Sequence, residues 1–403
     1  MKSPAEQNSI LLRGTDQVVP PDELAERLGE GRLLRVKLGL DPTAPAVTLG
    51  WAVVLRKLRQ FQELGHKAVL IVGDFTAQVG DPSDRASQRK RLSADEVRGY
   101  ADAVLNGFKK VLIWDDSVLE VRYNSEWLAK LDMGDVLELT SKVTVAQVLE
   151  RGDFQKRFND NQPISLMEFM YPLLQGMDSV AVDADIELGG SDQLWNNMMG
   201  RVLQERYGKR GQMVMTMPLL VGTDGEHKMS QSLGNYIAVD DDPADMFGKV
   251  MSIPDQLMAQ YFQLAADLPE EEAEAVIKGL DDGSLHPGEA KRRLGREIVG
   301  LYWGSEAAEA AEAAFDQVFK RGEIPDEVQE FALPSDDPIF LPALLREAGL
   351  VKSSSEARRL ISQGAVKMDG ETVTDETLSR STLDGITVQV GKRRFVKLIA
   401  DDR

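Results

Sequence analysis

Residues 38–66 combine a polar turn with the start of a helix, and they have the sequence LGLDPTAPAVTLGWAVVLRKLRQFQELGH. The first part is a β-rich run that ends in Gly39, Asp41 and Thr43, and the second part has apolar residues at helical spacing. A strand, a small polar loop and a helix N-terminus form the arrangement with which α/β proteins hold phosphate. We therefore expect a nucleotide-binding turn here, although residues 48–51, Thr-Leu-Gly-Trp, contain neither lysine nor histidine.

A second polar loop follows the next predicted strand and has the sequence GDFTAQVGDPSDRASQR. Its polar residues are Asp74, Thr76, Gln78, Asp81, Arg85 and Arg89. One interpretation is a solvated surface loop. The other is a ligand-facing rim, because ligands of open α/β sheets bind at the carboxyl ends of the strands. In that case the planar guanidinium groups of Arg85 and Arg89 suit phosphate oxygens.

A third polar cluster lies in EFMYPLLQGMDSVAVDADIELGGSDQLWNN. Tyr171, Gln175 and Asp178 are spaced i, i+4 and i+7, so they share one face of a helix. Polar residues on an otherwise apolar face are costly to bury without partners. The face is therefore either a satisfied buried polar network or a pocket for a small polar ligand. Residues 189–193, Gly-Gly-Ser-Asp-Gln, begin the next helix, and the glycines allow close backbone approach.

A fourth stretch, DGEHKMSQSLGNYI at residues 224–237, contains a single lysine, Lys228. A mobile loop at this place could fold over a polyphosphate. Flexible loops of serine, glycine and lysine are common, so this stretch has little weight alone.

Composition narrows the class of protein. The 403 residues are enough for two or three domains, and no apolar run has the length of a membrane span. The absence of cysteine excludes disulfides, thiolate metal sites and a cysteine nucleophile, and three scattered histidines do not suit a metal site, so we expect no bound metal. The N-terminal residues lack the features of a secretion signal, and we expect a cytoplasmic protein without membrane contact. The net charge of −19 opposes nucleic-acid binding overall, but two C-terminal segments are locally basic.

The order of predicted elements indicates an α/β protein with several domains. Residues 1–222 alternate β-rich runs with helical patterns, which predicts a parallel sheet covered by helices on both faces, with a helical insertion at about 128–161. Residues 223–322 begin with the polar loop and then become almost purely helical. Residues 323–338 contain three prolines and many acids, which favours a linker. Residues 339–403 predict two short helices and small strands with turns at Gly364, Gly370 and Gly391.

Together, these four stretches resemble the class I aminoacyl-tRNA synthetases, and among them the bacterial tyrosyl family, over nearly the whole chain. LGLDPTAPAVTLG is similar to the family's first nucleotide motif, and KMSQSLGNYI resembles the second motif, Lys-Met-Ser-Lys-Ser. GDFTAQVGDPS, YPLLQGMDS and ELGGSDQ are similar to segments of its amino-acid and adenylate pockets. The last 65 residues resemble an S4-type RNA-binding module. The resemblance implies a Rossmann-like catalytic domain, an all-α domain on the anticodon side and a small α+β module.

The resemblance also implies the ligands and the residues that bind them. L-tyrosine would react with ATP, accompanied by Mg²⁺, to give tyrosyl-adenylate, and the tyrosyl group would pass to tRNA(Tyr). No protein-bound cofactor is implied. Asp178 would accept the phenol hydroxyl of tyrosine, and Lys37 stands where many relatives present a tyrosine to that phenol. The other residues of the tyrosine site would be Thr76, Asp81, Tyr171, Gln175 and Gln193.

By the same resemblance, Lys228, Arg85 and Arg89 would stabilise the departing pyrophosphate, and Asp192 would lie near the ribose. The ATP site would consist of Gly39, Asp41, Thr43, Gly50, Gly190, Asp192, Lys228, Met229 and Ser230. The RNA-binding residues would be Lys352, Arg358, Arg359, Lys392, Arg393 and Arg394; a solvated charged helix is the alternative interpretation. A homodimer with residues around 128–170 at the contact is also implied.

Besides Lys37, three positions in the two nucleotide motifs depart from the family's pattern. Thr48 and Trp51 stand where the first motif has its two histidines, and Gln231 stands where the second motif has its second lysine. Either Thr48 and Trp51 compensate, as a hydroxyl donor and as a ring packed on ribose, or the chain is a non-catalytic paralogue that binds RNA or tyrosine. The first hypothesis, an active ligase, is favoured because the pocket residues and the RNA module are present.

Overall fold

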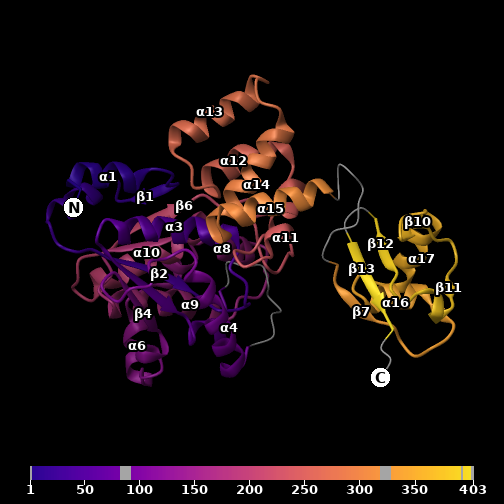
Figure 1. Ribbon diagram of the computed structural model, residues 1–403. Coiled ribbons are helices and arrows are strands. Elements are labelled where there is room, and N and C mark those ends of the chain that lie inside the picture. Colours follow the sequence, from indigo (N-terminus) through magenta and orange to yellow (C-terminus); the bar gives the residue numbers. More distant parts are fainter. Residues whose placement is uncertain (1, 82–91, 318–327, 392–393, 401–403) are drawn as a thin grey trace. The chain divides into compact units, whose positions relative to one another are not determined.

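The computed structural model describes residues 2–81, 92–317, 328–391 and 394–400. The chain divides into two compact units, Met1–Ser305 and Glu306–Arg403. Figure 1 shows the helices and strands of both units. The predicted boundary at residue 222 lies inside the first unit and remains a prediction.

A six-stranded sheet forms the centre of the first unit, in the order β1-β6-β5-β2-β3-β4. The strands are β1 (Gln17–Val19), β2 (Arg35–Leu40), β3 (Lys67–Val72), β4 (Leu119–Tyr123), β5 (Ile186–Gly190) and β6 (Met213–Met217). Strands β2 to β6 pair in parallel, which confirms the predicted parallel sheet, while β1 adds an antiparallel edge. Apart from its first residue, β3 is buried throughout, as expected for a strand of a sheet covered on both faces.

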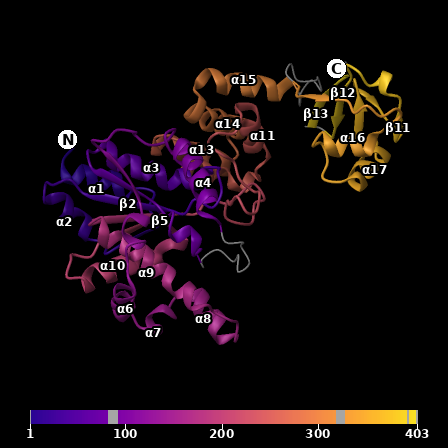
Figure 2. The same ribbon diagram turned by 90° about the horizontal axis from the view of Figure 1, so that it is seen from below.

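Helices pack on both sides of this sheet. α3 (Leu49–Glu63) lies on one side, and α9 (Leu166–Ala181) and α10 (Leu194–Arg206) lie on the other (Figures 1 and 2). α4 (Ala94–Phe108) begins with the predicted capping box, in which Ser93 and Glu96 bond each other's backbone N–H groups. The N-terminal residues add α1 (Pro4–Leu12) and α2 (Glu23–Gly29).

Short helices fill the interval between β4 and α9, where the sequence predicts a helical insertion. They are α5 (Ser125–Leu128), α6 (Met133–Ser141), α7 (Val145–Val148) and α8 (Gly152–Asn159). The side chains of Leu128 and Leu139 are buried in one cluster with Leu173 and Leu174 of α9. The insertion therefore shares a core with the helix that carries the predicted amino-acid pocket.

The first unit ends in helices, as the pattern after residue 242 predicts. They are α11 (Pro243–Ser252), α12 (Met258–Leu264), α13 (Glu270–Asp281) and α14 (Pro287–Trp303). Asp242 caps α11 by accepting a hydrogen bond from the backbone N–H of Ala244. Among the helices of the described residues, none combines the length and the hydrophobicity that crossing a membrane requires.

The second unit contains α15 (Ser305–Asp316), whose last eleven residues belong to it, and a small α+β fold. Its helices α16 (Leu341–Glu347) and α17 (Ser354–Ser362) pack on a sheet of order β10-β9-β12-β13-β7. Its strands are β7 (Glu330–Ala332), β8 (Ile339–Phe340), β9 (Val366–Met368), β10 (Glu371–Thr372), β11 (Thr377–Leu378), β12 (Thr387–Val390) and β13 (Arg394–Ile399). Gly364, Gly370 and Gly391 all have positive φ, as the predicted turns require.

Part of the predicted linker belongs to this second fold, which corrects its extent. Residues 330–332 form β7 and pair in parallel with β13, and Leu333 is buried in the core. The sequence pattern missed this strand because the short apolar run of residues 331–333 stands among acids and prolines. Residues 323–327 lie outside the described chain.

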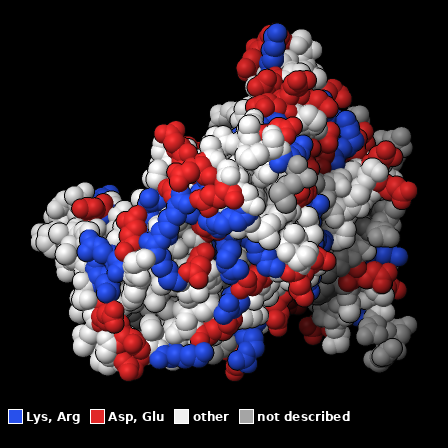
Figure 3. All heavy atoms as spheres, turned by 90° about the vertical axis from the view of Figure 1, so that its left-hand side faces the viewer, with Lys and Arg blue, Asp and Glu red and all other residues white. Residues whose placement is uncertain are grey.

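Acidic and basic side chains are interspersed on the face of the molecule shown in Figure 3. In the first unit, Arg210 contacts the carboxylates of Glu23, Glu26 and Glu30. Such a mixed surface offers no single-sign field to attract a polyanion to this face. Any contact with nucleic acid there would have to be local.

Candidate amino-acid and nucleotide site

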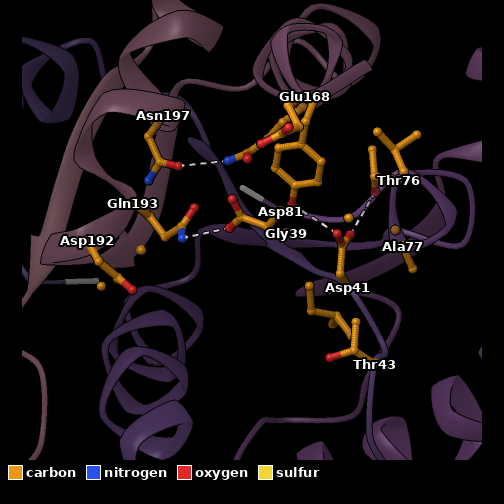
Figure 4. Close-up of a pocket in the computed structure, with 18 of the residues that line it drawn as sticks. Gly39, Asp41, Thr43, Thr76, Ala77, Asp81, Glu168, Asp192, Gln193 and Asn197 are labelled. Atoms are coloured by element: carbon orange, nitrogen blue, oxygen red, sulfur yellow. Dashed lines mark hydrogen bonds between the residues drawn. The ribbon is translucent and has the colours of Figure 1, made fainter. Parts of the chain in front are cut away.

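A cavity of about 1720 Å³ opens at the carboxyl ends of the parallel strands. The structure brings most of the predicted site residues to its wall, and Figure 4 shows ten of the lining residues with labels. The predicted residues that line the cavity are Gly39, Asp41, Thr43, Gly50, Trp51, Thr76, Asp81, Tyr171, Gln175, Asp178, Gly190, Asp192, Gln193, Lys228 and Met229. Lys37, Thr48 and Ser230 are described but are absent from this wall. Arg85 and Arg89 lie outside the described residues.

Asp178 forms the floor of the cavity, with only 3% of its surface exposed. Its Oδ1 accepts a hydrogen bond from Trp127 Nε1 at 2.9 Å, and its Oδ2 accepts one from Asn124 Nδ2 at 3.3 Å. Burial raises the pKa of Asp178 to about 7, against the opposing charge of Lys37 and these two hydrogen bonds. The two hydrogen bonds therefore hold the carboxyl group in one orientation, and its pKa lies close to neutral pH.

Asp41 also lines the cavity, directly after the end of β2, and is partly exposed. Its Oδ1 accepts a hydrogen bond from Thr76 Oγ1 at 2.7 Å, and its Oδ2 accepts one from Tyr171 Oη at 2.9 Å. Loss of hydration raises the pKa of Asp41 to about 7, although both hydrogen bonds oppose this shift. The same surroundings raise the pKa of Tyr171 well above its usual value, so its hydroxyl stays protonated and donates.

Lys37 does not line the cavity, so the structure gives no support to its predicted contact with a phenol. Its side chain is fully buried, and its Nζ donates to Glu187 Oε1 at 2.9 Å, Ser179 Oγ at 2.8 Å and the Gln175 carbonyl at 3.1 Å. The physical reason is the sheet register, because Lys37 and Glu187 are direct partners on the neighbouring strands β2 and β5. The ion pair supports the helix segment that carries Gln175.

Two amide groups on the cavity wall have unused hydrogen-bonding capacity. Within the described chain, Gln175 Oε1 and Asn197 Nδ2 are buried without a hydrogen-bond partner. The other atoms of these groups are engaged, since Gln175 Nε2 donates to Asn197 Oδ1 at 3.0 Å and to Glu187 Oε1 at 3.2 Å. A buried unsatisfied acceptor and donor mark places where a polar ligand can bond.

Gly189 and Gly190, at the end of β5, have no room for a side chain. A β-carbon at Gly189 would lie 2.7 Å from Asn197 Nδ2, and one at Gly190 would lie 2.7 Å from Asp192 Oδ1. Gln193, which follows in the 3-10 helix η2 (Ser191–Gln193), donates from Nε2 to Asp81 Oδ2 at 3.1 Å. The end of β5 therefore packs closely against the side chains of Asn197 and Asp192.

The two unusual residues of the first motif have different positions. Thr48 is 1% exposed and is the N-cap of α3, with its Oγ1 accepting from the backbone N–H of Trp51 at 3.3 Å. Its predicted catalytic role therefore has no contact with the cavity to support it. Trp51 does line the cavity, with 36% of its surface exposed and its ring 5.8 Å from the ring of Phe108.

The loop of residues 222–237 reaches the cavity through Lys228 and Met229. Lys228 Nζ lies 2.8 Å from Asp192 Oδ2, so the predicted cation and the predicted ribose-binding carboxylate are paired with each other. Ser230 points away from the wall: its Oγ contacts Ser232 Oγ at 2.8 Å, and its backbone N–H donates to Asn235 Oδ1 at 2.9 Å.

Sequence reasoning missed several residues of the site. Asn124 and Trp127, which orient Asp178, follow β4 in the run RYNSEW, and polar residues directly after a predicted strand were the signal that could have found them. Arg157 and Glu168, which pair at 2.5 Å on the cavity wall, come from the insertion and from α9. Neither residue stood in a recognisable motif.

The predicted RNA-binding residues of the second unit are partly engaged with carboxylates. Arg358 Nε lies 3.1 Å from Glu376 Oε2, and its guanidinium group lies over the ring of Phe340. Arg394 lies 3.8 Å from Glu356. Lys352, which precedes α17, and Arg359, which lies within it, are exposed, and Lys392 and Arg393 lie outside the described residues.

The fold and this site define a class of protein. The sequence model of the family described as class I tRNA synthetases (W and Y) matches residues 30–320, and that of the S4 domain matches residues 341–376. The chain belongs to the class I tRNA synthetases of the tryptophan and tyrosine type and carries an S4 domain.

Two relatives that are similar to this chain over nearly its whole length are tyrosine–tRNA ligases. The chain is 50% identical to the tyrosine–tRNA ligase of Moorella thermoacetica over 398 residues, which cover 98% of this chain and 96% of the relative. It is 49% identical to the tyrosine–tRNA ligase of Carboxydothermus hydrogenoformans over 402 residues, or 98% and 97% of the two chains.

Solved structures share the fold at low sequence identity. The tyrosyl-tRNA synthetase of Archaeoglobus fulgidus, complexed with L-tyrosine, superimposes with a TM-score of 0.62 at 22% identity, over 76% of this chain and 99% of that one. A C-terminally truncated mitochondrial tyrosyl-tRNA synthetase of Aspergillus nidulans gives 0.63 at 21% identity, over 79% and 95%.

Proposed function

We propose that this protein is a tyrosine–tRNA ligase, which activates L-tyrosine with ATP and transfers the tyrosyl group to tRNA(Tyr). The observation that carries the proposal is the floor of the cavity: a buried carboxyl group, Asp178, held by Trp127 and Asn124 where a phenol hydroxyl needs an acceptor. Identity of 49–50% to tyrosine–tRNA ligases over 98% of the chain supports the same conclusion.

In this proposal, tyrosine binds with its ring between β2 and α9. Its hydroxyl donates to Asp178, and its ammonium group donates to the unsatisfied Gln175 Oε1, near Asp81 and Tyr171. Phenylalanine fits the same space but leaves the buried Asp178 without a ligand partner. The site discriminates against it because phenylalanine cannot make the hydrogen bond that the tyrosine hydroxyl donates to Asp178.

ATP occupies the outer part of the cavity, along Gly39, Gly50 and the segment after β5. Asp192 binds the ribose once its ion pair with Lys228 opens, and Lys228 then contacts the phosphates. Mg²⁺ arrives with ATP and offsets the carboxylates of the wall. By the resemblance of their loop, Arg85 and Arg89 would add positive charge near the phosphates.

The first reaction is an in-line attack of the tyrosine carboxylate oxygen on the α-phosphorus of ATP. A new P–O bond forms to the carboxylate, the bond to the β-phosphate oxygen breaks, and pyrophosphate leaves. In the second reaction a terminal ribose hydroxyl of tRNA attacks the tyrosyl carbonyl, and AMP leaves. The protein needs no covalent intermediate, because it works by positioning the reactants and by neutralising developing charge.

The insertion and the start of α9 offer a surface for a second copy of the chain. Five large apolar side chains between residues 133 and 166 are at least 61% exposed: Met133, Leu137, Val145, Phe158 and Leu166. Apolar side chains concentrated in this way favour protein contact. A homodimer formed through this surface is part of the proposal.

The S4 unit is proposed to contact the tRNA backbone. Lys352, Arg358 and Arg359 are exposed in and just before α17, and Lys352 and Arg359 suit phosphate contacts to structured RNA, while Arg358 is paired with Glu376. Because tRNA charging supplies the ribosome, we place the protein in the cytoplasm.

A non-catalytic paralogue remains the second candidate, favoured by one observation. Thr48 is used as a helix cap and Trp51 packs against Phe108, so neither departure from the first motif is seen to supply a new charge to the cavity. In that case the chain would bind tyrosine or tRNA without activating the amino acid.

Tyrosine-dependent exchange of pyrophosphate into ATP tests the proposal. We expect exchange with L-tyrosine and little with phenylalanine, and no exchange at saturating ATP would contradict the ligase. The double variant Thr48→His/Trp51→His separates the two candidates. A large gain in exchange indicates a decayed site, whereas a loss indicates that Trp51 contributes to the active site.

A further inference from the structure

Gln231 joins the two nucleotide motifs directly. Its Oε1 accepts a hydrogen bond from the backbone N–H of Ala46 at 3.2 Å, although 185 positions separate the two residues in the sequence. Ala46 lies in the turn between β2 and α3, and Gln231 lies in the loop that carries Lys228. Both residues are partly buried, so water competes incompletely for this bond.

The same loop is attached on a second side of the cavity. Lys228 Nζ contacts Asp192 Oδ2 at 2.8 Å, directly after β5, whereas Ala46 follows β2. Because β2 and β5 are neighbours in the sheet, the loop bridges the carboxyl ends of two adjacent strands. Gln231 makes the attachment at one end of this bridge.

The interior of the loop is organised by Asn235, which is 4% exposed. Its Oδ1 accepts from the backbone N–H of Ser230, and its Nδ2 donates to Asp224 Oδ2 at 3.0 Å and to the Lys228 carbonyl at 3.2 Å. Because these hydrogen bonds hold the interior of the loop together, fixing Gln231 also restricts the backbone of Lys228, three residues away.

The loop also lies against the first turn of α3. A β-carbon at Gly50 would be 3.6 Å from Met229 Cβ, and the backbone N–H of Leu49 donates to the Ile237 carbonyl at 2.9 Å. Ala46 and Gln231 therefore meet at the edge of an existing contact between the two segments.

The residue type at position 231 decides whether this contact forms. The partner is a backbone N–H, which needs an acceptor, and the glutamine side chain provides an amide oxygen. A lysine side chain has three donors and no acceptor, so it cannot take the place of glutamine. Where the second motif has a lysine, this chain therefore lacks that positive charge but gains the hydrogen bond between Ala46 and Gln231, which fastens the loop.

We propose that Gln231 is a positioning residue, which fastens the Lys228 loop to the turn at Ala46 before nucleotide binds. The proposal rests on the proposed function for its effect on the reaction, but the attachment itself does not. Fixing the loop in advance reduces the ordering required at the transition state. Loss of Gln231 should therefore lower kcat and leave the tyrosine KM unchanged, since Gln231 does not line the cavity that holds Asp178.

Hydrogen–deuterium exchange of the full-length protein tests the attachment. The variants are Gln231→Leu, which removes the acceptor, and Gln231→Glu, which keeps one. Leu233→Ala is the matched control, because Leu233 lies in the same loop and is 56% exposed. We expect the Ala46 amide to exchange about two- to tenfold faster in Gln231→Leu and at the wild-type rate in the other two, as the loss of one hydrogen bond implies.

Pyrophosphate exchange on the same proteins tests the effect on the reaction. In Gln231→Leu we expect kcat to fall about two- to tenfold at constant tyrosine KM, with recovery in Gln231→Glu. Unchanged protection of the Ala46 amide in Gln231→Leu would overturn the attachment. Faster exchange of that amide without a fall in kcat would overturn the positioning role. If the wild-type protein shows no activity, the proposed function fails, and amide exchange alone decides the attachment.

Discussion

At the scale of single residues, the site depends on carboxyl groups with altered proton affinity. Asp41 and Asp178 both have a pKa raised to about 7, in each case mainly because water is removed from around the group. They differ in their partners, since Asp178 faces Trp127 and Asn124, whereas Asp41 faces Thr76 and Tyr171. In the proposed function, Asp178 accepts the hydroxyl of a substrate phenol, whereas Asp41 accepts hydroxyl groups of the protein itself, those of Thr76 and Tyr171.

The raised pKa of Asp178 predicts a pH-dependent affinity for tyrosine. Below about pH 7 the carboxyl group becomes protonated and is a weaker acceptor for the phenol, so the tyrosine KM should rise as the pH falls. Asp178→Asn should raise this KM at least about tenfold at pH 8, because a hydrogen bond to a charged acceptor is lost. Steady-state pyrophosphate exchange from pH 6 to pH 8.5 measures both, and a flat KM profile in the wild type would argue against the role of Asp178.

The same shift has a consequence for stability. Between about pH 4 and pH 7 the folded protein keeps a proton on Asp178 that the unfolded chain has lost, so this group's contribution to the free energy of unfolding falls as the pH rises through that range and is constant above it. Asp41 contributes in the same direction. Urea unfolding at pH 5 and pH 8 should show a smaller decline in Asp178→Asn than in the wild type.

The buried pair of Lys37 and Glu187 predicts an asymmetric response to substitution. Lys37→Met leaves the Glu187 carboxylate buried without its cation and should lower the free energy of unfolding by about 3–5 kcal/mol. The double variant Lys37→Met/Glu187→Leu should recover most of that loss, because neither charge is then buried. Urea unfolding measures both variants. Equal destabilisation of the single and double variants would show that packing, and not charge, is what Lys37 supplies.

At the scale of elements, local sequence signals placed the helices and strands, but the function of a terminal residue depended on its neighbours. The capping box at Ser93 and the five parallel strands were predictable from short patterns. Thr48 was predicted as a ligand-facing hydroxyl, yet the helix uses it as an N-cap. β7 went unrecognised because three residues are too few for a clear alternation.

The cap at Thr48 predicts a measurable effect on α3. Thr48→Ala should lower the free energy of unfolding by about 1 kcal/mol, because the backbone N–H of Trp51 loses its acceptor. Thr48→Ser keeps the hydroxyl and should remain within a few tenths of the wild type. Chemical unfolding curves compare the three proteins. A loss in Thr48→Ser as large as that in Thr48→Ala would assign the effect to the methyl group instead.

At the scale of the whole molecule, the proposed reaction needs contacts beyond the cavity. The apolar surface of the insertion is proposed for a second copy, and the cations of the S4 unit are proposed for tRNA. The first surface adjoins the helix that carries Asp178, since α6 and α9 share a buried cluster. Association through it would therefore buttress the amino-acid pocket.

The proposed dimer can be disrupted at its most exposed apolar residue. Leu166 is 81% exposed, and Leu166→Asp should weaken self-association at least about tenfold, because a charge would be buried in an apolar contact. Leu33→Asp is the control, since Leu33 is 55% exposed outside the insertion. Sedimentation velocity over a range of concentrations measures the result. A variant that sediments like the wild type would place the contact elsewhere.

The S4 unit should affect transfer to tRNA but not adenylate formation. Lys352→Ala/Arg359→Ala should raise the KM for tRNA and reduce the slope of log affinity against log salt by about 1 to 2. Pyrophosphate exchange, which needs no tRNA, should be unchanged. Lys2→Ala, at an exposed lysine of the first unit, is the charge-matched control. Equal tRNA affinity in all proteins would contradict the proposed contact.

The sequence alone determined the order of elements, the α/β class, the family resemblance and fifteen of the residues that line the cavity, because these depend on short-range periodicity and on motifs of adjacent residues. The tertiary structure decided which atoms meet. Lys37 bonds Glu187 across 150 positions, Trp127 orients Asp178 across 51, and Gln231 reaches Ala46 across 185. Such partners follow from sheet register and packing, and no pattern of neighbouring residues contains that information.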